Sequence, residues 1–326
     1  MKNYKGKEEM VVYETPFPKE ISIGEKTIKP DIISDIPRAS LDRETIGIVL
    51  GNPTFWDSTI VGKPSIHENV KQVREYFHNL FGMSDHDIVP SQYWLFNDGI
   101  TSNDFKTVFD PDMGYIRKKV ISSLEYSEKD SLDLMVYFSG EGTTHNGEKV
   151  ILPYDADSTN SNSFFPVKRL YSNLANIQAI PEVGNVTLFM DVDFNNPSFT
   201  QSIVKQSDIV ENPKKKKKKK KGEAEEPLNV LPKEIMPPET ITVFFASNTT
   251  QLAYDHPDHS SSMFTYYLLK GLKGAADNGD KMVTVSELHN YVLKNVEDST
   301  KTLYKDLPQI PILFTSNPDR VLYKLP

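Results

Sequence analysis

Cysteine is absent from all 326 residues of the chain. Its absence excludes disulfide bridges, thiolate metal sites and any chemistry that needs a thiol nucleophile. Long apolar runs are also missing, since no stretch approaches 18 consecutive apolar residues, and we therefore expect no transmembrane helix. The first residues, Met1 to Pro30, are charged and have no apolar stretch of the signal-peptide kind. The sequence therefore predicts a soluble protein, with the cytoplasm as its location.

Charge is unevenly distributed along the chain. The net charge is −8, yet eight lysines form one run, Lys214–Lys221. Subtracting these eight from the 37 basic residues leaves 29 against 45 acidic ones, so the rest of the chain is strongly acidic. An acidic body repels nucleic acid, and we expect no nucleic-acid partner. The lysine run fits a solvated low-complexity linker, but it could also contact an anionic surface or an acidic partner, or be cut by a trypsin-like protease.

The remaining sequence alternates between strand and helix patterns. This alternation predicts an α/β fold with about six mostly parallel strands sandwiched between helices. Ser65 is expected to cap the first long helix, with Glu68 completing a capping box. The expected strands are 45–51, 88–96 (starting after Pro90), 132–140, 185–191, 240–246 and 310–314; the expected helices are 65–81, 112–126, 167–178, 260–271 and 284–296.

A lysine- and proline-rich segment interrupts this alternation between the fourth and fifth expected strands. We predict an N-terminal arm over 1–40, a first half of the fold over 41–196, an insertion over 197–238 and a second half over 239–326. The insertion divides the chain without dividing the fold, because strands on both sides continue one pattern.

Three stretches together resemble the caspase-like peptidases, especially the metacaspase type. They are Val136-Tyr-Phe-Ser-Gly-Glu-Gly-Thr143 followed by Ile151-Leu-Pro-Tyr-Asp155, then Leu188-Phe-Met-Asp-Val-Asp193, and then Phe245 through the Met263-Phe-Thr helix to Val283-Thr-Val-Ser-Glu287. The resemblance covers roughly residues 44–315. It implies a caspase-like sheet made from a large-subunit half and a small-subunit half.

Two departures from the family pattern decide what the resemblance can mean. Glu141 stands at the family's catalytic histidine position, and Asp193 stands at its cysteine position. A cysteine protease needs a thiolate activated by an imidazole, and here neither group exists. Cysteine-protease activity is therefore excluded, and the sequence favours a catalytically inactive pseudoprotease that acts as a binding, regulatory or scaffold module.

Glu141, Asp191 and Asp193 are the candidate binding residues, because the carboxyl ends of neighbouring parallel strands meet at the edge where α/β proteins bind ligands. Asp191 stands where the metacaspase-type specificity pocket has a carboxylate, so the resemblance implies recognition of a basic peptide segment or of the chain's own lysine run. Alternatively, the carboxylates are solvated in an unused cleft, bind a divalent cation, or act as acid and base of a hydrolase. We expect no resident cofactor or metal.

Three other motifs are weaker candidates. His145 follows Glu141 by four residues, but a lone loop histidine is more often a surface residue than a base. His256 and His259, with their neighbouring aspartates, could hold a metal, although such clusters are usually loops. Residues 276–287 resemble a calcium-binding loop only faintly, and a turn at Asn278-Gly279 explains them better.

Overall fold

The computed structural model describes residues 30–90, 99–126, 131–195, 236–248, 251–304 and 307–326. Six strands form the main path of its central sheet in the order β2-β1-β3-β6-β7-β9. Neighbours along this path are parallel except for β9, which pairs antiparallel with β7. The α/β fold predicted from the alternating pattern is confirmed.

Helices and strands alternate along most of the described chain. In chain order they are α1 (Pro30–Ile33), β1 (Glu44–Gly51), α2 (Ser65–Asn79), β2 (Ile88–Val89), α3 (Ser102–Phe109), α4 (Tyr115–Tyr126), β3 (Leu132–His145), β4 (Glu148–Ile151), β5 (Phe165–Pro166), α5 (Val167–Gln178), β6 (Val183–Asp193), β7 (Ile241–Phe245), α7 (Met263–Lys270), β8 (Met282–Thr284), α8 (Val285–Tyr304), β9 (Ile312–Phe314) and β10 (Val321–Lys324).

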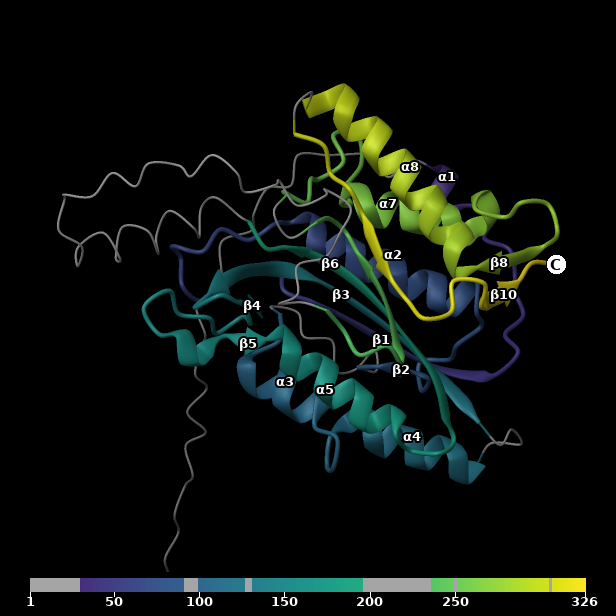
Figure 1. The fold of residues 1–326 in the computed structure, drawn as a ribbon, viewed down its shortest axis with the longest axis horizontal. Helices are drawn as coiled ribbons and strands as arrows, with labels where there is room; N and C mark the ends of the chain where they lie inside the picture. The colour runs from purple at the N-terminus through teal and green to yellow at the C-terminus, as the bar shows by residue number, and fades with distance from the viewer. Residues whose placement is uncertain (1–29, 91–98, 127–130, 196–235, 249–250, 305–306) are drawn as a thin grey trace, which may run out of the picture.

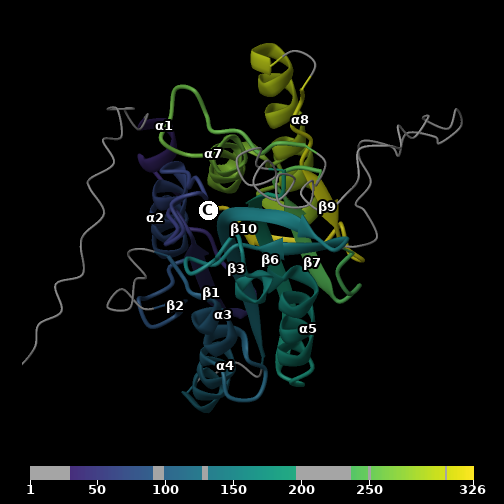
Figure 2. The same cartoon turned by 90° about the vertical axis from the view of Figure 1, so that its left-hand side faces the viewer.

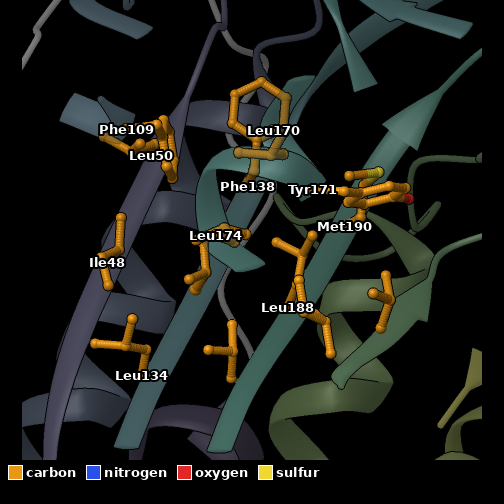
Figure 3. Close-up of a cluster of buried hydrophobic side chains, with 14 of the residues drawn as sticks. Ile48, Leu50, Phe109, Leu134, Phe138, Leu170, Tyr171, Leu174, Leu188 and Met190 are labelled. Carbon is orange, nitrogen blue, oxygen red and sulfur yellow. The ribbon is translucent and has the colours of Figure 1, made fainter. Parts of the chain in front are cut away.

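Helices cover both faces of the sheet. Helices α3, α4 and α5 lie on one face, and α2, α7 and α8 lie on the other (Figures 1 and 2). Side chains alternate along each strand, so Ile48 and Leu50 enter the core under α3–α5, while Val49 enters the core under α2 and α7. Figure 3 shows the first core, where Leu134, Phe138 and Leu188 meet the side chains of α5.

Strands from both sides of the insertion share this sheet. β6, the last strand before the insertion, pairs in parallel with β7, the first strand after it, from Val186–Ile241 to Met190–Phe245. The predicted insertion 197–238 lies almost wholly outside the described residues, as does the lysine run, and so do the first 29 residues of the predicted N-terminal arm.

Several sequence predictions need correction. Ser65 does not cap α2; Pro64 takes that position without a side-chain hydrogen bond, and the Ser65 hydroxyl instead donates to Asp255 Oδ1 at 2.6 Å. The strand expected over 88–96 is described only at Ile88–Val89, before Pro90, and residues 91–98 lie outside the described part. Helix α3 is an element that the pattern did not predict, although Thr101 and Asp104 form its capping box.

Four further strands extend beyond the expected ranges or were missed. β3 continues past Gly140 to His145 and turns into an antiparallel hairpin with β4. β8 and β10 form a separate two-stranded antiparallel sheet, which pattern analysis did not detect because its strands have only three and four residues.

Candidate functional site

The register of the central strands brings the three predicted site residues together. Glu141 on β3 lies opposite Asp193 on β6, and Ser139 lies opposite Asp191 two residues earlier. All of them stand at the carboxyl ends of parallel strands, as the sequence predicted. The expectation that solvent covers the carboxylates is wrong, because the exposed fraction is 0 % for Glu141, 3 % for Asp193 and 5 % for Asp191.

Lys63 forms ion pairs with both carboxylates at the family's catalytic positions. Its Nζ lies 2.9 Å from Asp193 Oδ2 and 3.3 Å from Glu141 Oε1. The same ammonium donates to the carbonyl oxygen of Ala253 at 3.0 Å. One cation thus joins the ends of β3 and β6 to the segment before α7. Buried carboxylates normally need a partner of this kind, since an isolated buried charge is very costly.

Electrostatics keep this lysine protonated. Burial of the ammonium disfavours its charge, but attraction by Glu141 and Asp193, together with the hydrogen bond to Asp193, outweighs burial and holds the pKa of Lys63 above its ordinary value. A lysine that is protonated and held by two carboxylates is neither a nucleophile nor a general base at neutral pH. In this arrangement the three side chains form an ion network and not an acid–base pair.

The loop between β1 and α2 places Lys63 in the cleft. Gly62 passes so close to Pro53 that a Cβ added to Gly62 would lie 2.0 Å from the Pro53 carbonyl oxygen, so only glycine fits there. On the other side of Lys63, the Ser65 hydroxyl is bonded to Asp255. The backbone N–H of Ile66 donates to the carbonyl of Lys63 at 3.1 Å, which begins α2. The lysine is therefore fixed from both sides.

Asp191 has a different environment, made of neutral donors. Its Oδ2 accepts hydrogen bonds from the hydroxyls of Ser262 and Thr265, the latter at 2.7 Å, and from Asn69 Nδ2 at 3.2 Å. Tyr137 adds a longer contact of 3.4 Å. Burial raises the pKa of the Asp191 carboxyl, while the two hydroxyl donors and the charge of Lys63 act against that rise.

These contacts leave almost no free space in the cleft. Lys63, Asn69, Asp191 and Asp193 are among the residues that surround a cavity of about 10 Å³, which is about the smallest volume that holds one water molecule. A lysine or arginine side chain of a peptide does not fit beside Asp191 in this conformation. Lys63 occupies the position beside these carboxylates. The predicted binding of the lysine run Lys214–Lys221 at this site is not tested, because that run lies outside the described residues.

The other candidate residues lie away from this network. His145 ends β3, where its ring contacts Asn146 and Phe164. His256 and His259 lie against each other with ring centroids 4.2 Å apart, and His259 stacks on Tyr266 at 4.0 Å. Within the described part of the chain, no group of three or more histidine, aspartate and glutamate side chains is arranged to hold a metal ion.

Sequence reasoning found the carboxylates and missed Lys63. The lysine stands in a loop without periodicity, and its partners Glu141 and Asp193 lie 78 and 130 residues further along the chain.

The turn predicted at Asn278-Gly279 is present, with φ of +107° at Gly279. It leads into β8 before α8 begins. Thr284 caps α8 by accepting from the Glu287 backbone N–H, and the Glu287 carboxylate accepts from the Thr284 backbone N–H in return.

Comparison with known protein families agrees with the α/β fold. The family model described as "Caspase domain" matches residues 49–323, which is most of the chain. A search of curated proteins gave no match. In the part of the chain that the structure describes, no helix is both long and apolar enough to cross a membrane. Because the family model matches most of the chain, including positions 141 and 193, the chain belongs to the caspase domain family.

Proposed function

We propose that this protein is a catalytically inactive caspase-domain pseudoenzyme that works as a binding, regulatory or scaffold module for another protein. The observation that carries the proposal is the ion pairing of Lys63 Nζ with both Glu141 and Asp193, the residues at the family's dyad positions. A site without the family's thiol and imidazole, and with a protonated lysine between the carboxylates, lacks the activated nucleophile that a cysteine peptidase uses.

The closed cleft also changes which surface is expected to bind a partner. The sequence favoured a basic peptide in the acidic groove, but Lys63 already supplies the positive charge there and the remaining cavity is about 10 Å³. A peptide would have to displace Lys63 and separate its ion pairs, which is costly for buried charges. We therefore propose that partners contact the outside of the domain, and the cytoplasmic location stays a prediction.

Peptide hydrolysis and peptide binding in parallel test this proposal. Fluorogenic peptides with Lys, Arg or Asp before the scissile bond are expected to show no turnover above the level of a Glu141→Gln/Asp193→Asn variant. Lysine- and arginine-containing peptides are expected not to bind the wild-type cleft in a calorimetric titration. Turnover that is lost in the Glu141→Gln/Asp193→Asn variant would make the protein a hydrolase that uses these carboxylates, and the proposal would fail.

A further inference from the structure

A second polar cavity lies at the opposite end of the same strands. It has a volume of about 230 Å³ and lies beside the amino-terminal parts of β1, β3 and β6 and the start of β10. Arg43, Asp133, Asn185, Arg320 and Tyr323 are among the residues that line it. Drug-sized ligands occupy cavities from roughly 300 Å³ upward, so this one fits a smaller group.

Two guanidinium groups face this cavity, and neither has its donors fully used. Among the described residues, Arg320 donates one hydrogen bond, from Nη2 to Thr187 Oγ1 at 2.7 Å. Arg43 Nη1 lies 3.6 Å from Asp133 Oδ1, which is an ion pair too long for a good hydrogen bond. A guanidinium carries five N–H donors in a planar fork, so most of these donors remain available to a ligand in the cavity.

The carboxylate between them is already engaged. Asp133 accepts from the backbone N–H of Asn185 at 2.8 Å and from Asn185 Nδ2 at 3.0 Å. The other carboxylate of the lining, Asp42, pairs with Lys324 at 2.8 Å. Counting the lining residues and their ion-pair partners, three cations stand against two carboxylates, which leaves one positive charge in excess.

The two arginines also disfavour each other. Burial lowers the pKa of Arg320 below its ordinary value; Asp133 opposes that effect, and the like charge of Arg43 adds to it. An anion between the two guanidinium groups would remove this repulsion and use their free donors. Arginine pairs recognise phosphate and similar oxyanions through paired N–H···O bonds.

We infer that the cavity formed by Arg43, Asp133, Asn185 and Arg320 is a binding site for a small oxyanion of the phosphate class, either inorganic phosphate or a phosphate monoester. The site is independent of the closed cleft, because it lies at the other end of the strands and shares no lining residue with it. The inference therefore stands or falls separately from the proposed function.

Calorimetric titration of the full chain with inorganic phosphate and with phenyl phosphate tests the inference, against sodium chloride at matched ionic strength. Saturable binding with a Kd of about 1 mM or tighter is expected for at least one of the two. Tighter binding of phenyl phosphate would identify a monoester as the ligand, and tighter binding of inorganic phosphate would identify the free ion. If chloride reproduces the signal, or if neither compound saturates, the inference is wrong.

Three variants locate the site. Arg43→Gln is expected to weaken binding at least tenfold, whereas Arg169→Gln, an exposed arginine on α5, is expected to leave it unchanged. Asp133→Asn removes the competing negative charge while keeping the side chain's size, and it is expected to tighten binding about fivefold. Equal binding by Arg43→Gln and Arg169→Gln, or weaker binding by Asp133→Asn, would overturn the assignment.

Discussion

Strands β3 and β6 carry polar clusters at both ends, and the two clusters are built in opposite ways. At the carboxyl ends, Lys63 pairs with Glu141 and Asp193 next to a cavity of about 10 Å³. At the amino ends, Arg43 and Arg320 face a cavity of about 230 Å³, and most of their guanidinium N–H groups have no acceptor among the described residues. The first cluster holds its cation between two carboxylates and leaves almost no free space, while the second leaves N–H donors and space unused.

At the carboxyl ends the charged side chains pair with one another around almost no free space, whereas at the amino ends they border an open cavity. Both catalytic positions of the family pattern carry acids in this chain, and a loop lysine pairs with them. Such a network is expected to matter for stability and specificity of packing and not for chemistry. Four predictions test the contrast between the two ends.

Lys63→Met is expected to have the largest effect. It leaves the buried carboxylates of Glu141 and Asp193 without their cation, which costs about 3–5 kcal/mol in comparable buried pairs. Urea denaturation at pH 7 measures the loss. As a matched control, Lys168→Met removes an exposed partner of Glu148 and is expected to cost less than about 1 kcal/mol. Similar losses in both variants would contradict the contrast between buried and exposed pairs.

Asp191→Ala is expected to cost about 3 kcal/mol, because it removes the common acceptor of Ser262, Thr265 and Asn69 and leaves buried donors unpaired. Asp191→Asn keeps an acceptor oxygen of similar position, so we expect a clearly smaller loss. Denaturation of the two variants side by side checks this. If alanine and asparagine cost the same, these hydrogen bonds do not stabilise the fold.

Alkaline pH is expected to weaken the carboxyl-end cluster selectively. The pKa of Lys63 is higher in the folded than in the unfolded chain, so its contribution is complete below the ordinary lysine value of 10.5 and declines as the pH rises through the folded value. Wild type should therefore lose stability above pH 10.5 more steeply than a Lys63→Met/Glu141→Gln/Asp193→Asn variant. Because both proteins keep the same tyrosines, parallel curves would exclude a role for Lys63 in this loss.

Arg43→Gln is expected to have the smallest effect on stability, below about 1 kcal/mol, because the Arg43 side chain is 44 % exposed and its pair with Asp133 is long. Thermal melting without phosphate measures it. A loss as large as that of Lys63→Met would mean that the amino-end cluster is also a structural network, and the difference between the two ends would disappear.

Much of this arrangement could be predicted from the sequence, since apolar runs that end in glycine or acidic residues mark β1, β3 and β6. Their parallel pairing brings Glu141, Asp191 and Asp193 to one edge, and only local information is needed for that step. The family resemblance then identified Glu141 and Asp193 as the positions that differ from the family's catalytic pattern. Both the predicted fold and the predicted family are confirmed.

Lys63 could not be predicted in this way, because nothing in its neighbourhood signals a contact across 78 or 130 residues. Chemistry gives one hint, because two buried acids need a cation nearby. The sequence contains many lysines, however, and does not show which of them is that cation. Ser65 was misassigned for a related reason, as its capping pattern is local while its actual acceptor, Asp255, belongs to a distant segment. Sequence patterns therefore predict the strands, but they do not predict polar contacts between residues that are far apart in the sequence.

A double-mutant cycle between Lys63→Met and Asp193→Asn tests the central claim most directly. The account predicts that each single change destabilises the protein, and that the double variant loses less than the two single losses combined, with a coupling energy of about 2 kcal/mol or more in urea denaturation at pH 7. Additive losses, with no coupling between the two positions, would show that Lys63 and Asp193 do not stabilise each other and would contradict the account.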